Sequence, residues 1–143
     1  MNVHGNMAHR HFKPEVTARV VADRVVAAGG DAVVVPELVK HRKGGLEIVG
    51  WQVHYAPSYL PDWVLDPRCK EEPKVMELLK VLSQWYDWIN VQRIRNELYL
   101  EEPEFRRTVE LARMLHLVEH PGGSQSRLVL LSAGRARVEA ASA

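Results

Sequence analysis

Three arginines gather in one short segment of the second half of the chain. Arg106, Arg107 and Arg113 carry planar guanidinium groups, which bind phosphates and the edges of guanine bases. Acidic residues accompany them at spacings that allow i, i+4 pairs, and such pairs commonly balance a solvated helix face. These acids are Glu102, Glu104 and Glu110. The residues therefore leave two interpretations open, a nucleic-acid contact and a solvated surface.

A second basic group stands in the first half of the chain, between two apolar segments. Lys40, Arg42 and Lys43 precede Gly44-Gly45, a pair that is typical of a tight turn. Such a cluster can contact phosphates or an acidic partner. It can equally be the solvated tip of a β-hairpin, and the sequence does not separate these two interpretations.

No pattern typical of catalysis is present. The chain lacks a phosphate-binding glycine loop, an HExxH sequence, a nucleophile elbow and a dinucleotide fingerprint. Asp62 and Asp66 are spaced like paired carboxylates, but their proline-rich surroundings favour a role in capping turns. His4, His9 and His11 could bind a metal, although three histidines in a flexible terminus predict no site. We therefore expect no enzyme, no cofactor and no metal.

The length, composition, net charge and cysteine count restrict the class of protein but do not indicate its function. The 143 residues suffice for one domain or two small ones, and 46% hydrophobic with 26% charged residues is typical of a folded chain. A net charge of +1 neither supports nor excludes nucleic acid. Cys69 is the only cysteine, so no internal disulfide is possible. Without a membrane-length apolar run or a signal peptide, we expect a cytoplasmic protein with no membrane partner.

The first half predicts a helix and a β-hairpin in one domain, residues 14–56. We expect residues 1–13 to be flexible. A helix begins at Pro14-Glu15 and ends at Gly29-Gly30. Its apolar stripe is expected to comprise Val16, Val20, Val25 and Val26.

Two strands are expected after this helix, at residues 32–39 and 46–56. Pro36 marks the first as an edge strand or the site of a bulge. Alternation in the second places four apolar side chains on one face: Val49, Trp51, Val53 and Tyr55. Residues 57–72, rich in proline and aromatic side chains, would form an irregular connector that packs across the domains.

The second half, residues 73–143, predicts a second domain of helices with a two-stranded ribbon, so the fold class is α+β. The expected helices span 73–85, 91–99, 104–115 and 133–141, and the expected strands span 117–120 and 127–132. Apolar residues at helical spacing give the first helix its buried face: Val75, Leu78, Leu79 and Leu82. The aromatic residues Trp85, Tyr86 and Trp88 are expected in the core and in the packing between the domains.

This order of elements resembles the winged helix-turn-helix of DNA-binding regulators. The resemblance runs without a gap from Ile89-Asn90-Val91-Gln92-Arg93-Ile94 to Leu115-His116-Leu117-Val118-Glu119-His120. The run from Arg127 to Arg135 resembles the second wing strand and helix start of the MarR-type branch. That branch commonly has Leu-Ser/Thr-x-x-Gly-Arg, whereas here one residue lies between Ser132 and Gly134.

The resemblance implies a transcriptional regulator that binds double-stranded DNA, with a homodimer as a further expectation. Residues 90–99 would be the positioning helix and 104–115 the recognition helix. The implied DNA-binding residues are Arg95, Arg106, Arg107, Thr108, Arg113, Arg127 and Arg135.

Two departures from the family pattern favour an alternative. The recognition helix begins with acidic residues, and the wing tip has no basic residue before Arg127. A winged helix of this kind could instead bind a protein of the transcription machinery, such as RNA polymerase, as phage-type accessory proteins do.

Overall fold

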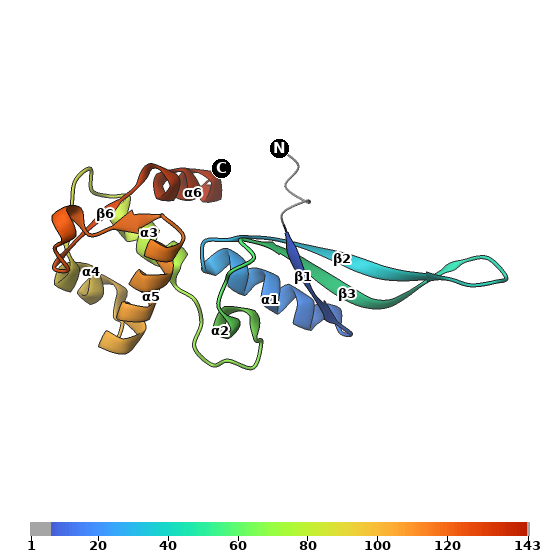
Figure 1. Ribbon diagram of the computed structural model, residues 1–143. Coiled ribbons are helices and arrows are strands. Elements are labelled where there is room, and N and C mark those ends of the chain that lie inside the picture. The colour runs from blue at the N-terminus through green and yellow to red at the C-terminus, as the bar shows by residue number, and fades with distance from the viewer. Residues whose placement is uncertain (1–6, 143) are drawn as a thin grey trace. The chain divides into compact units, whose positions relative to one another are not determined.

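The computed structural model describes residues 7–142, which divide into two compact units. Unit 1 comprises the residues up to Val26 together with Gly30–Glu72, and unit 2 comprises Ala27–Gly29 with Pro73–Ala143. Within residues 7–142 there are six α-helices and two three-stranded antiparallel sheets, which confirms the α+β class (Figure 1). None of the helices in this described range has the length and apolar character needed to cross a membrane.

Unit 1 is built on a sheet of three strands in the order β1-β3-β2. The strands are β1 (Ala8–Phe12), β2 (Asp31–Lys40) and β3 (Leu46–Ala56). β2 lies at an edge, and the register with β3 shifts between Glu37 and Leu38, one residue beyond Pro36. A proline has no N–H for the ladder, so the prediction of an edge strand or bulge is confirmed.

Strand β1 corrects the expectation of flexibility for residues 8–12. Residues 8–12 pair with β3 from Ala8 opposite Tyr55 to Phe12 opposite Trp51. Alternate side chains of β1, at Ala8, Arg10 and Phe12, are partly buried while the histidines between them are exposed. The polar composition concealed this period of two, because only one face of the strand is covered. His4 lies outside the described residues.

Helix α1 (Glu15–Ala27) buries a different face from the one expected. Its buried residues are Ala18, Val21, Arg24 and Val25. The expected stripe holds only for Val25, since Val16, Val20 and Val26 are exposed. The sequence of α1 contains several sets of small apolar residues at helical spacing, so more than one face could be buried. The face that is buried is the one that carries Arg24.

Arg24 ties α1 to the segment that follows the sheet. Its Nε donates to the carbonyl of Val64 at 2.9 Å, and its Nη2 donates to the carbonyls of Trp63 at 2.5 Å and Glu71 at 2.9 Å. Within the expected irregular connector lies a short helix, α2 (Asp62–Leu65), whose residues Val64 and Leu65 are buried. The buried cation is thus stabilised by backbone dipoles.

The first helix of the main segment of unit 2, residues 73–143, is α3 (Val75–Leu82), whose expected buried face is confirmed. The chain continues through β4 (Ile89–Asn90), α4 (Val91–Leu98), α5 (Glu102–Met114) and β5 (Val118–Glu119). A 3-10 turn at Pro121–Gly123 leads to β6 (Arg127–Leu130) and α6 (Ser132–Ser142). The small sheet has the order β4-β6-β5, so β6 is its central strand.

The loop between α3 and β4 departs from the expected aromatic packing. Tyr86 is 98% exposed and Trp88 is exposed, while Trp85 is partly buried. Arginines lie over the rings at 4.5 Å for Arg93 on Trp85 and 4.3 Å for Arg127 on Trp88, measured from guanidinium carbon to ring centroid. These rings therefore act mainly as platforms for arginine side chains.

Candidate functional site

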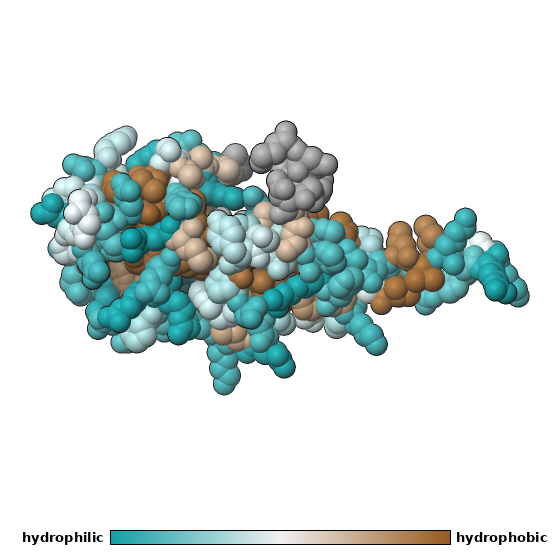
Figure 2. All heavy atoms as spheres, viewed as in Figure 1, coloured by the Kyte–Doolittle hydropathy of each residue, from teal (hydrophilic) through white to brown (hydrophobic). Residues whose placement is uncertain are grey.

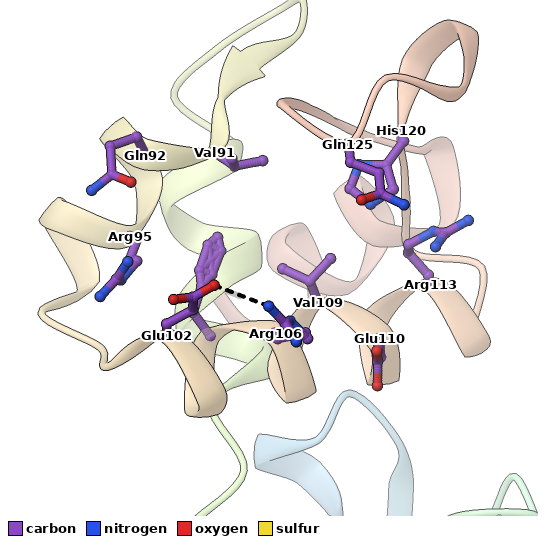
Figure 3. Close-up of a pocket in the computed structure, with 11 residues that line it drawn as sticks. Val91, Gln92, Arg95, Glu102, Arg106, Val109, Glu110, Arg113, His120 and Gln125 are labelled. Atoms are coloured by element: carbon purple, nitrogen blue, oxygen red, sulfur yellow. Dashed lines mark hydrogen bonds and ion pairs between the residues drawn. The ribbon is translucent and has the colours of Figure 1, made fainter.

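One feature of unit 2 that could receive a partner is an open cavity of about 580 Å³. It lies between α4, α5 and the turn that joins β5 to β6 (Figure 3). Eleven residues line it: Val91, Gln92, Arg95, Glu102, Phe105, Arg106, Val109, Glu110, Arg113, His120 and Gln125. Because every lining residue belongs to unit 2, the cavity is defined within one compact unit.

The start of α4 is fixed against the hairpin by backbone and side-chain contacts. Asn90 caps the helix, because its side-chain oxygen accepts from the N–H of Gln92 at 2.8 Å. Asn90 also stands opposite Arg127 in the β4–β6 pair, and the N–H of Val91 donates to the carbonyl of Ser126 at 2.9 Å. These bonds place Val91 and Gln92 at one rim of the cavity.

Helix α5 contributes the remaining wall through residues that recur every three to four positions. Pro103 lies in its first turn, where a missing N–H is tolerated. Arg106, Val109 and Arg113 share one face, which lines the cavity (Figure 3). The opposite face, including Leu111 and Ala112, is buried in the core of the unit. One side of α5 is therefore available to a partner.

The charges around the cavity are mixed, with a small positive excess. Arg95, Arg106 and Arg113 meet two carboxylates, Glu102 and Glu110, which leaves a formal charge of 3 − 2 = +1 with histidine neutral. The Nε of Arg95 donates to the carbonyl of Leu100 at 3.1 Å, which anchors this side chain. Arg106 donates to Glu102 at 2.9 Å, the contact dashed in Figure 3.

The hairpin turn supplies neutral hydrogen-bonding groups to the opposite rim. The Nδ1 of His120 donates to the carbonyl of Arg127 at 2.8 Å, which leaves Nε2 as an acceptor in the neutral ring. Gln125 adds an amide that can donate or accept (Figure 3). Sequence reasoning missed Gln92, His120 and Gln125, because uncharged polar residues beside a turn carry no distinguishing signal.

The structure brings together only part of the set implied for DNA. Arg95, Arg106 and Arg113 line one cavity, whereas Arg107 is exposed on α5 outside the lining. Thr108 was expected at an exposed position of the recognition helix, but its side chain is buried at 5% exposure and its Oγ1 donates to the carbonyl of Glu104 at 2.8 Å. Its hydroxyl donates to a carbonyl of its own helix and is not exposed to a partner.

Two further arginines lie away from the cavity lining. Arg127 is exposed on β6 with its guanidinium over Trp88. Arg135, on α6, is half-buried, and its Nη2 donates to the carbonyl of Trp85 at 3.2 Å. The bond from Arg135 to Trp85 holds the α3–β4 loop against α6. This structural role accounts for the arginine at position 135 without a ligand.

The second basic group and the histidines belong to unit 1. Lys40, Arg42 and Lys43 are exposed at the β2–β3 turn. His9 stacks on His54 with ring centroids 5.5 Å apart. Among residues 7–142, no three side chains of His, Cys, Asp or Glu are grouped so that they could hold a metal ion.

Comparisons with family models, with curated proteins and with solved structures found no match for this chain.

Proposed function

We propose that unit 2 is a winged helix and that its cavity surface binds duplex DNA, so that the chain acts as a transcriptional regulator. The order helix, strand, helix, helix, strand, strand supports this proposal, as does the pairing of β4 with β6. In such a domain the third helix enters the major groove and the hairpin lies over the adjacent backbone. α5 and the β5–β6 turn would take these two positions.

The observation that carries the proposal is the convergence of three arginines on one concave surface. Arg95 comes from α4, and Arg106 and Arg113 come from the open face of α5. The major groove is about 12 Å wide and admits a helix. Guanidinium groups on that helix would bind phosphates and guanine edges, while Gln92 and Gln125 offer amides to bases or backbone. Bound in this way at a promoter, the protein would block or recruit polymerase.

Two adjacent arginines of α5 provide a matched test. Arg106→Ala removes a cation from the cavity, whereas Arg107→Ala removes the same charge from the same helix outside it. We expect Arg106→Ala to weaken binding of a fluorescent duplex and to reduce the log–log salt slope by about 0.9. Arg107→Ala should change both quantities less. If the two variants change affinity and salt slope equally, or if neither variant changes them, the cavity does not contact DNA.

A second candidate function follows from the two carboxylates in the cavity. Glu102 engages Arg106, and Glu110 adds a further negative charge that phosphates would repel. A surface with both signs of charge suits a basic or mixed protein partner, such as a component of RNA polymerase. Recovery of a polymerase subunit in a pull-down that Arg106→Ala abolishes, with no affinity for duplex DNA at low salt, would favour this candidate.

A further inference from the structure

The β2–β3 hairpin of unit 1 continues as a two-stranded arm beyond the end of β1 (Figure 1). β1 pairs with β3 only from Trp51 to Tyr55, so residues 37–50, here called the arm, have no third strand. The bulge at Glu37/Leu38 marks the point where the arm begins. An isolated two-stranded hairpin is only marginally stable in water, so a long hairpin gains stability when it packs against another surface.

Large aliphatic side chains are exposed along the arm. Leu38 stands opposite Ile48 and Lys40 opposite Leu46, so these four side chains share one face. The exposed fractions are 52% for Leu38, 66% for Leu46 and 52% for Ile48. Val39 and Val49 are exposed as well, and Figure 2 shows hydrophobic atoms grouped on the arm before its hydrophilic tip. A cluster of this kind marks a contact surface.

The tip of the arm presents basic residues outward. The N–H of Gly44 donates to the carbonyl of His41 at 3.1 Å, which closes a turn with Arg42 and Lys43 at its centre. The N–H of His41 donates to the carbonyl of Gly45 at 3.2 Å. Gly44 and Gly45 have φ of 82° and 93°, values that other residues rarely adopt. The turn therefore depends on both glycines.

The charge of the arm favours an anionic partner. Its two acids are engaged by histidine rings, Glu37 by His11 and Glu47 by His41, the latter at 2.7 Å. By contrast, the side chains of Lys40, Arg42 and Lys43 have no hydrogen bond or ion pair within the described part of the chain. An exposed basic tip beside an aliphatic face complements a surface with phosphates at its border and apolar groups between them.

We propose that the arm is a second DNA-binding element, which lies in the major groove of the duplex that unit 2 contacts. The groove admits a two-stranded ribbon, and its floor carries the C5-methyl groups of thymines. Leu38, Leu46 and Ile48 contact these methyl groups, while the cations of the tip bind phosphates. This inference rests on the proposed function for the choice of duplex DNA, but it uses residues of the other unit.

The test measures binding of the full chain to a 40-base-pair duplex of mixed sequence by fluorescence anisotropy, between roughly 50 and 200 mM salt. The triple variant Lys40→Ala/Arg42→Ala/Lys43→Ala is expected to lower the salt slope by up to about 2.7, at 0.9 for each phosphate contact. The matched control removes three exposed cations elsewhere in unit 1, through Lys13→Ala/Arg19→Ala/Lys70→Ala. It should leave most of the slope intact.

The aliphatic face is tested separately with Leu38→Ser/Ile48→Ser. This variant keeps the charge, so we expect weaker binding with an unchanged salt slope. A duplex with deoxyuridine in place of thymidine lacks the methyl groups. It should bind the native chain more weakly than the thymidine duplex, and the difference should vanish in the serine variant.

The outcomes separate the arm from the cavity of unit 2. An unchanged slope in the triple variant, together with a reduced slope in Arg106→Ala, overturns the arm and leaves the proposed function standing. A reduced slope in the triple variant, together with an unchanged slope in Arg106→Ala, supports DNA binding by the arm and contradicts DNA binding by the cavity. If light scattering shows that the native chain is a dimer and Leu38→Ser/Ile48→Ser a monomer, a second copy covers the aliphatic face and the proposal for the arm is wrong.

Discussion

Glu102 and Arg106 form a 2.9 Å ion pair across one turn of α5, at the wall of the cavity. Both side chains are largely exposed, at 64% and 70%, so water screens the pair and its contribution to stability is small. If the cavity binds DNA as proposed, the effect of the pair on binding would be different, because the carboxylate occupies a guanidinium that a phosphate would engage. Glu102 would then compete with phosphate for the same cation.

Replacing this acid is expected to strengthen DNA binding. Glu102→Gln removes a negative charge and releases Arg106, and a charge pair at 4 Å in water is worth about 1 kcal/mol, or roughly a fivefold change in affinity. Glu97→Gln is the control, since Glu97 pairs with Arg93 at 3.9 Å outside the cavity. Anisotropy titrations of both variants at one salt concentration measure the effect. Unchanged or weaker DNA binding by Glu102→Gln would show that this carboxylate does not compete with phosphate for Arg106.

Gly134 is expected to resist substitution although it lies in a helix. An added Cβ would lie 2.6 Å from Cδ1 of Leu130 and would also meet the carbonyl oxygen of Leu117. Helix propensity alone favours alanine by about 1 kcal/mol, but overpacking typically costs about 1–3 kcal/mol, so the free energy of unfolding should fall. Urea denaturation of Gly134→Ala measures it.

Ala136→Gly is the control for that substitution, because Ala136 is exposed in the same helix. It should lose roughly 1 kcal/mol from propensity alone. If Gly134→Ala instead proves more stable than the native chain, α6 does not approach the hairpin as closely as the structure has it.

The helices of unit 2 could be predicted from the sequence because each has a local signal. Leu78 and Leu79 belong to an apolar stripe, Asn90 is a favoured cap and Pro103 starts a helix. Strand β4 was not predicted, since two residues are too few to show alternation. Its existence depends on the partner strand β6, which is distant in sequence.

The candidate site was predictable only in its charges. Arg95, Arg106 and Arg113 could be named because arginine suits phosphate, and the structure gathers these three around the cavity. Thr108 was misassigned because hydroxyl residues are common on exposed faces, whereas here the hydroxyl bonds within its own helix. Which side of a helix faces the core depends on tertiary contacts that no local pattern contains.

Arg24 offers a test of the packing of unit 1. Arg24→Met keeps an unbranched apolar stem but leaves three carbonyl oxygens without their donor. Since each buried acceptor left unsatisfied costs roughly 1–3 kcal/mol, we expect a loss of about 3 kcal/mol. Arg19→Met, at an exposed position of the same helix, should change stability little. Hydrogen exchange of peptides covering residues 60–72 should accelerate in the first variant alone.

Tyr99 is expected to hold α4 and α5 in position at a conformational cost. It caps α4 with φ 55° and ψ 38°, the left-handed region, and its side chain is 93% exposed. Left-handed backbone costs a residue with a Cβ roughly 1–2 kcal/mol, and glycine avoids most of that penalty. Tyr99→Gly loses few contacts, so we expect the free energy of unfolding to rise by about 0.5–1 kcal/mol, after subtraction of the greater entropy of the unfolded chain.

Asn96→Gly is the matched control for Tyr99→Gly, because Asn96 is exposed in α4 and has helical backbone. Replacing Asn96 by glycine should lower the free energy of unfolding by a few tenths of a kcal/mol, because glycine has the lower helix propensity. If the backbone alone explains Tyr99, Tyr99→Gly will be more stable and will bind duplex DNA as the native chain does. Greater stability with weaker DNA binding would mean that the exposed ring contacts the ligand, which extends the site from the cavity to the turn between the two helices.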